Sequence, residues 1–90
     1  MSDDPDAIEL SFPCEYPVKI FGRDEDNFKD FVIELFSRHV PGLPLEAFSA
    51  RQSSGGKYVS ISVTFIAESR AQVDALYQEL GKHPRVLIAM

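Results

Sequence analysis

The residues able to support nucleophilic chemistry are few in this sequence, which has one cysteine and two histidines. Cys14 lies between Pro13 and Glu15, where the neighbouring carboxylate disfavours the reactive thiolate. His39 falls at the end of a helical pattern and His83 directly precedes a proline, so each has a structural explanation. Because no nucleophile is paired with a base, we expect a protein that is not an enzyme.

Metal and phosphate sites are not expected either. One cysteine and two histidines far apart in the chain do not match the ligand spacing of a zinc site. The acidic run 24–26 precedes a predicted helix, where it would repel a phosphate group. We therefore expect no metal and no cofactor.

Charge is divided unevenly along the chain, whose formal net charge is −5. Residues 1–11 hold four acidic and no basic residues, which gives −4, and residues 12–90 hold ten acidic and nine basic residues, which gives −1. We interpret residues 1–11 as a disordered acidic leader and residues 12–90 as a single domain. The nearly neutral domain offers no basic footprint, so binding of nucleic acid is not expected.

Several features point to the cytoplasm. No apolar run approaches the length of a membrane span, and the N-terminus lacks the basic and apolar regions of a signal peptide. A single cysteine excludes an internal disulfide and suits a reducing compartment. We therefore expect a cytoplasmic protein without a membrane partner.

The clearest secondary-structure signal is a strand at 55–67. Apolar and small polar residues alternate in it, so one face of the strand is apolar and the other carries small polar side chains. The apolar set is Val59, Ile61, Val63 and Phe65, and the polar set is Ser60, Ser62 and Thr64.

The first half of the chain reads as a strand followed by a helix. The strand lies within 12–22, with pairing expected to begin after Pro17 and Gly22 ending it at a tight turn. Asp24 is the predicted N-cap of the helix, which ends before Pro41. One apolar face at helical spacing comprises Phe28, Phe31, Val32, Leu35 and Phe36.

The second half repeats this plan after an edge strand. That strand lies within 43–53 and forms a hairpin with the strand at 55–67. Ser69 and Gln72 form a capping box for a second helix, with Gly81 predicted just past its end. A short strand over 86–90 completes a β-α-β-β-α-β order. This is the α+β, ferredoxin-like sandwich, with an antiparallel four-stranded sheet of order 4-1-3-2 and two helices on one face.

The assembled motifs resemble the YbeD family of small uncharacterised bacterial proteins. The similarity runs from Phe12 to the C-terminus. It rests on Phe12-Pro13 and on four longer segments, which are Lys19-Ile20-Phe21-Gly22, Arg38-His39-Val40-Pro41-Gly42, residues 53–62 and residues 76–81. The resemblance implies a fold similar to the ACT regulatory domains and no established activity. ACT-type effector sites use the turn after the first strand, which here is Gly22, Arg23 and Asp24.

Two functions remain. The first is a non-catalytic regulatory or protein-interaction module, whose partner is another protein of unknown identity or a second copy in a homodimer. The second is an ACT-like sensor of an amino acid or another metabolite, with its effector loop at Gly22, Arg23 and Asp24. RNA binding is disfavoured because serines and a threonine stand where base-stacking aromatics are expected. The predicted contact surface is the open sheet face, with Lys19, Phe21, Tyr58, Ser60, Ser62 and Thr64.

Overall fold

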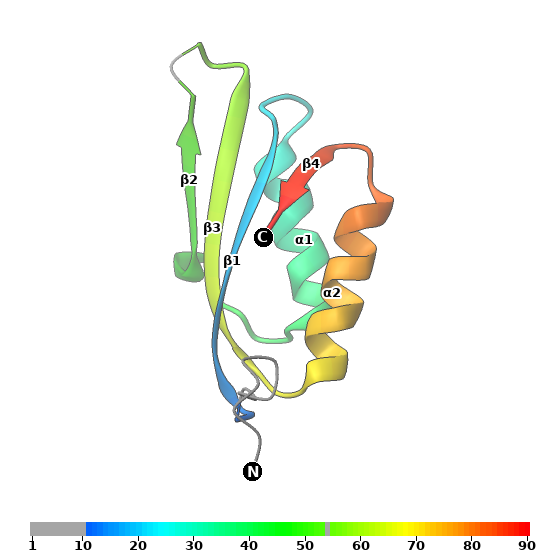
Figure 1. Ribbon diagram of the computed structural model, residues 1–90. Helices are drawn as coiled ribbons and strands as arrows, with labels where there is room; N and C mark the ends of the chain where they lie inside the picture. The colour runs from blue at the N-terminus through cyan, green and yellow to red at the C-terminus, as the bar shows by residue number, and fades with distance from the viewer. Residues whose placement is uncertain (1–10, 54) are drawn as a thin grey trace, which may run out of the picture.

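The elements follow one another in the predicted order in a computed structural model, which describes residues 11–53 and 55–90 (Figure 1). The predicted leader, except for Ser11, lies outside the described residues. The elements are β1 (Cys14–Arg23), α1 (Phe28–His39), a short 3-10 helix η2 (Leu45–Ala47), β2 (Phe48–Gln52), β3 (Tyr58–Ala67), α2 (Arg70–Lys82) and β4 (Val86–Ala89).

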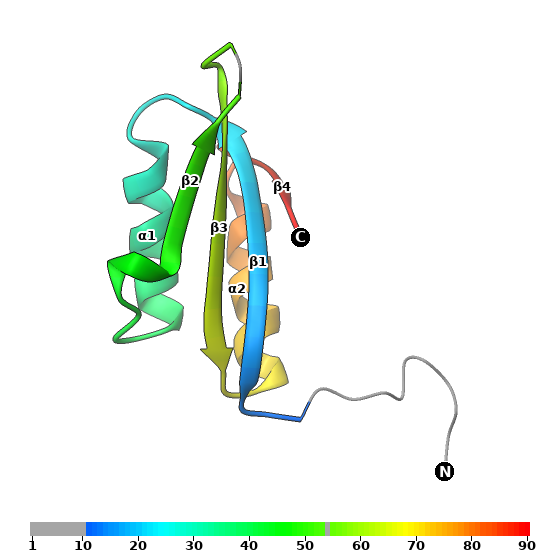
Figure 2. The same ribbon diagram turned by 90° about the vertical axis from the view of Figure 1, so that its left-hand side faces the viewer.

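The four strands form one antiparallel sheet in the order β2-β3-β1-β4, which confirms the predicted topology. Both helices cover the same face of this sheet, and Figure 2 views the sheet from the side that no helix covers. No helix among residues 11–53 and 55–90 is long and apolar enough to cross a bilayer.

Strands β1 and β3 pair without interruption from Cys14 opposite Ala67 to Arg23 opposite Tyr58. The expectation that pairing begins after Pro17 is therefore wrong. Lys19 donates its N–H to Met90, on the side of β1 away from β3, at 2.7 Å. The nitrogen of Pro17 points to that same side, because backbone groups two residues apart in a strand have the same orientation. A proline is thus tolerated in a central strand.

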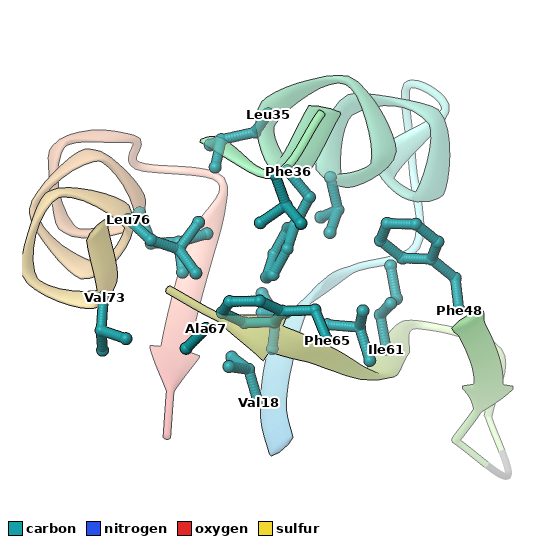
Figure 3. Close-up of a cluster of buried hydrophobic side chains, with 14 of the residues drawn as sticks. Val18, Leu35, Phe36, Phe48, Ile61, Phe65, Ala67, Val73 and Leu76 are labelled. Atoms are coloured by element: carbon teal, nitrogen blue, oxygen red, sulfur yellow. The ribbon is translucent and has the colours of Figure 1, made fainter. Parts of the chain in front are cut away.

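The apolar face of β3 lies against both helices, as its alternation predicts (Figure 3). The ring of Phe36 from α1 packs edge-on against those of Phe48 and Phe65, with centroids 5.7 and 6.0 Å apart. The buried core consists of Val18, Ile20, Phe28, Val32, Leu35, Phe36, Val40, Phe48, Val59, Ile61, Val63, Phe65, Ala67, Val73, Leu76 and Leu80.

The start of α1 differs from the prediction. Asp24 is not the N-cap, because the helix begins at Phe28 and Asn27 takes the cap position. Asn27 and the preceding Asp26 both have left-handed backbone conformations, with φ of 56° and 54°. Left-handed conformations are uncommon in residues other than glycine. The loop before α1 must therefore be held in this conformation by contacts from elsewhere in the fold.

The start of α2 has the predicted cap at Ser69, but the side-chain oxygen of Gln72 accepts from the N–H of Glu68 and not from that of Ser69, as a capping box would require. A hydrogen bond of Gln72 also connects this helix to α1. The backbone N–H of Gln72 donates to Oγ of Ser69 at 3.1 Å. The side chain of Gln72 then donates to the carbonyl oxygen of His39 at 2.8 Å, which joins this end of α2 to the end of α1. The helix continues to Lys82, so the prediction that Gly81 lies just past its end is wrong.

Gly22 lies inside β1 and is buried, so the prediction that it ends the strand is wrong. A Cβ placed on it would lie 2.6 Å from Cε1 of Phe28 and 2.7 Å from the carbonyl oxygen of Arg85. Its φ is not in the left-handed region. The glycine is therefore required by the close approach of α1 and of the segment before β4, and not by a turn.

The Gly22→Ala substitution is expected to lower the free energy of unfolding by about 1–3 kcal/mol, because the added methyl group overpacks a closed site. The matched control is Gly81→Ala in α2, where an added Cβ meets no atom within 4 Å. This control should raise stability by about 0.5–1 kcal/mol, since alanine is the better helix former. Urea unfolding of both variants measures the two effects, and equal effects would contradict the packing explanation.

Candidate functional site

The six residues of the predicted contact surface lie together on the sheet face opposite the helices. We call this the helix-free face, and it is the side of the sheet that faces the viewer in Figure 2. In the β1–β3 ladder, Lys19 lies opposite Ser62 and Phe21 lies opposite Ser60. Tyr58 and Thr64 alternate with buried residues of β3, so they share this face. The structure thus brings together every residue that the sequence assigned to the surface.

Strand β4 and Met90, the residue that follows it, add two large apolar side chains that the sequence prediction did not include. Ile88 lies opposite Phe21, and Met90 exchanges two backbone hydrogen bonds with Lys19, at 2.7 and 2.9 Å. Residues directly opposite one another project to the same face. Ile88 is 53% exposed and Met90 61%, while Tyr58 is 45% exposed. The predicted strand order could have indicated this neighbourhood, but not the register.

The small side chains of β3 leave two shallow hollows on the helix-free face. One, of about 230 Å³, is lined by Phe21, Tyr58 and Ser60 from the central strands and by Arg51 from β2. The other, of about 350 Å³, is lined on this face by Lys19, Ser62, Thr64 and Met90, with neighbouring strand residues. The face therefore offers apolar rims beside depressions that side chains of another molecule can fill.

The three residues of the predicted effector loop do not form one unit. Gly22 is buried beneath α1, whereas Arg23 is exposed at the end of β1. Asp24 accepts a hydrogen bond from the side chain of Gln52 and donates its N–H to the carbonyl oxygen of Lys57 at 2.8 Å. It is thereby tied to the β2–β3 hairpin.

Two further hollows flank this loop, and Arg23 lines both. One, of about 310 Å³, lies toward Pro84 and Leu87, with Arg85 on its wall. The other, of about 390 Å³, lies toward the hairpin residues Lys57 and Tyr58. Charged residues of both signs surround the loop, since Glu25 also lines both hollows.

Arg85 holds the loop before α1 in place. Its Nη2 donates to the carbonyl oxygen of Glu25 at 2.9 Å and to that of Asp26. Its guanidinium carbon lies 4.7 Å from the centroid of the Phe31 ring, a cation–π contact. These bonds account for the two left-handed residues in the loop, and they come from a residue about sixty positions later in the chain.

The structure brings both histidines to one carboxylate, which the sequence reading missed. Oε1 of Glu79 lies 2.6 Å from Nε2 of His39, and its other oxygen accepts from Arg38 and lies 3.6 Å from Nε2 of His83. These hydrogen bonds, with that from His39 the largest effect, lower the pKa of Glu79 to about 2. Its partners in this cluster include no cysteine or serine, so the group joins α1 to α2 and presents no nucleophile.

The cluster of His39, Glu79 and His83 contains residue types that can bind a metal ion. Within the described part of the chain, no group of three or more histidine, cysteine or acidic side chains is arranged to hold a metal ion. The guanidinium of Arg38 on the same carboxylate would also repel a cation.

Residues 8–90 match the family described as "Protein of unknown function (DUF493)". A UPF0250 protein of Pseudomonas aeruginosa is 37% identical over 89 residues, which cover 96% of each chain. A UPF0250 protein of Chromobacterium violaceum is 37% identical over 90 residues, which cover both chains completely. The chain belongs to this family. The predicted resemblance to the YbeD proteins is thereby confirmed.

A solved structure supports the fold of this UPF0250 protein. The solution structure of protein HP0495 from H. pylori matches with a TM-score of 0.72 and 16% sequence identity, over 100% of this chain and 94% of that one. At this identity the likeness bears on the fold alone. Neither the family description nor the names of these relatives state an activity, so function must be argued from the residues.

Replacing Glu79 should change how stability depends on pH. Its folded-state pKa of about 2 lies below the ordinary value of 4.5, so its contribution is complete above 4.5 and is lost as the pH falls toward 2. We expect Glu79→Gln to lower the free energy of unfolding at neutral pH by about 1 kcal/mol, with little difference from wild type near pH 2.

Urea unfolding at a series of pH values checks this expectation. Glu34→Gln is the matched control, because Glu34 is more exposed and meets Arg38 only at 3.9 Å. It should change stability by less than about 0.5 kcal/mol at any pH. A deficit in Glu79→Gln that stays constant from neutral pH to pH 2 would contradict the assigned pKa.

Proposed function

We propose that this UPF0250 protein is a non-catalytic regulatory or protein-interaction module of the cytoplasm, which binds another protein through its helix-free face. The observation that carries the proposal is the group of large apolar side chains left exposed there. Tyr58, Ile88 and Met90 remain about half exposed or more and surround the partly buried Phe21. Grouped exposed apolar residues with a polar rim are typical of interaction surfaces.

The energetics of this face favour contact with a protein. Full burial of one large apolar side chain contributes about 1.5–3 kcal/mol. Aromatic residues such as Phe21 and Tyr58 are frequent anchors at the centre of interfaces. The serines of β3 would let a partner approach the sheet closely, and the hollows beside Phe21 and beside Met90 would accommodate the partner's side chains.

The polar groups elsewhere support a non-catalytic role. The carboxylate of Glu79 is occupied by Arg38 and His39, and the guanidinium of Arg85 by backbone carbonyls. Groups that bond to one another in this way stabilise the fold, whereas a catalytic site needs polar groups that converge on a substrate.

Photo-crosslinking in the source bacterium tests the proposal. With Tyr58→benzoylphenylalanine, irradiation should yield adducts of discrete mass with another protein, because this position lies on the helix-free face. The control is Ala75→benzoylphenylalanine, at an exposed position of α2. Adding Phe21→Ser should remove the adducts of the Tyr58 variant, since it deletes the central apolar contact.

Equal adducts from the two crosslinking positions would contradict a surface restricted to the helix-free face. Failure of the Tyr58 variant to yield any adduct would contradict the interaction function itself. A circular-dichroism spectrum of each variant separates loss of contact from loss of fold.

A second candidate is an ACT-like sensor of a small molecule, and the hollows beside Arg23 favour it. Arg23 and the acidic residues Glu25 and Asp26 all line the 310 Å³ hollow. Such a pair of charges suits a zwitterion, with the arginine binding its carboxylate and the acids its ammonium group. This version of the site excludes Gly22, which lies buried.

A thermal-shift screen of amino acids tests this second candidate. A true ligand should raise the Tm by at least about 2 °C at saturation, because it binds only the folded state. Arg23→Ala should abolish the shift, and Lys29→Ala on the exposed side of α1 should keep it. If the protein is a monomer and no amino acid raises its Tm, the sensor function is contradicted.

A further inference from the structure

The helix-free face is basic, although the whole chain is acidic. Lys19 and Arg23 lie on either side of Phe21 along β1, and Arg51 lies in the same cross-strand row, opposite Ser60. Among the described residues, none of these three cations lies within 4.0 Å of a carboxylate. On the same face the only acidic side chain of the two central strands is that of Glu15, at the far end of β1.

The cations border the hollows that an incoming side chain would enter. Arg51 lines the hollow beside Phe21 and Tyr58, and Lys19 lines the hollow beside Met90. An apolar side chain seated in either hollow would therefore bring its neighbours in sequence close to a positive charge. Unpaired cations beside an apolar contact favour a partner that carries carboxylates there.

A second copy of this chain does not fit the same face. In a symmetric contact the same patch of both copies is used, so Lys19, Arg23 and Arg51 of both copies would be brought into one interface. Like charges brought together across an interface cost free energy, and Glu15, at the far end of β1, is the one acidic side chain that the two central strands place on this face. The occupant must therefore have a different charge pattern from that of the sheet.

We propose that the helix-free face binds an acidic protein segment that carries apolar side chains, seated along β3. This inference rests on the proposed function and adds the chemical class of the partner. The apolar side chains fill the hollows beside Phe21 and Met90, and the carboxylates of the segment pair with Lys19 and Arg51. The resulting ion pairs are exposed, so binding weakens as salt is raised.

Three matched synthetic peptides test the inference by NMR titration of the full ¹⁵N-labelled chain. One is built from leucine, serine and aspartate, and the others carry asparagine or lysine in place of every aspartate. We expect the aspartate peptide to shift amides of β1 and β3 around Phe21 and Ser60. The asparagine peptide should bind at least about tenfold more weakly, and the lysine peptide should not bind.

Charge reversal gives the decisive comparison. The double variant Lys19→Glu, Arg51→Glu should lose binding of the aspartate peptide and gain binding of the lysine peptide. The control, Lys29→Glu with Lys82→Glu on exposed positions of α1 and α2, should keep the wild-type preference. A single-stranded oligouridylate is titrated in parallel, since its phosphates share the negative charge.

The titrations separate failure of the acidic partner from failure of docking on the helix-free face. If the asparagine peptide shifts the helix-free face as strongly as the aspartate peptide, the acidic partner is overturned while the docking function stands. If the peptides shift only the amide signals of helix residues, both the acidic partner and docking on the helix-free face are overturned. No shift with the aspartate peptide, or tighter binding of the oligouridylate, overturns the acidic protein segment as occupant.

Discussion

The arrangement of this molecule depends on the register between β1 and β3. Ten consecutive pairs, from Cys14 opposite Ala67 to Arg23 opposite Tyr58, fix which side chains face the helices. A shift by one residue would turn every side chain of a strand to the opposite face. The buried row of Val18 and Ile20 would then be exposed, so the core holds the register in place. The same register determines that Phe21 and Ser60 lie together on the other side.

The close packing at Gly22 links the two faces. Phe28 and the backbone of Arg85 approach this glycine on the helix side, and the β1–β4 ladder changes register at the same point. On one side of this change Ile88 lies opposite Phe21, and on the other side Val86 lies opposite Gly22. The contact that closes the core therefore lies directly beside the pairing that puts Ile88 on the helix-free face. A side chain at position 22 would disturb both, although no part of Gly22 belongs to the surface.

The alternation of apolar and polar residues in the strands and the helical spacing of apolar residues predicted most of the fold. Each pattern is a local property of the sequence that the packing then reinforces. The strand at 58–67, the stripe of α1 and the cap at Ser69 were all readable in this way. The failures depended on distant contacts. Acidic residues at 24–26 suit a helix start, but Arg85 holds their loop outside the helix. The cluster at Glu79 joins residues about forty positions apart, and no spacing in the sequence relates them.

The residues of the helix-free face could be predicted only in part, for a similar reason. The polar side of β3 could be read directly, whereas Ile88, Met90 and Arg51 reach the face through strand neighbours. A predicted strand order names the neighbouring strands, but the pairing register decides which of their residues meet. Bulges such as the one at Gly22 change that register by local packing, which composition does not encode.

The net charge of the domain likewise does not reveal the charge of its helix-free face. Residues 12–90 carry a net charge of −1, which by itself argues against an anionic partner. The fold collects Lys19, Arg23 and Arg51 on one face, so a local attraction for carboxylates arises without a basic chain. Three cations neutralise at most three phosphates, and a single strand bound this way would show a salt slope of only about −2. So small a term would give weak binding of nucleic acid, whereas the proposed protein segment would add the burial of Phe21, Ile88 and Met90 to the same charges.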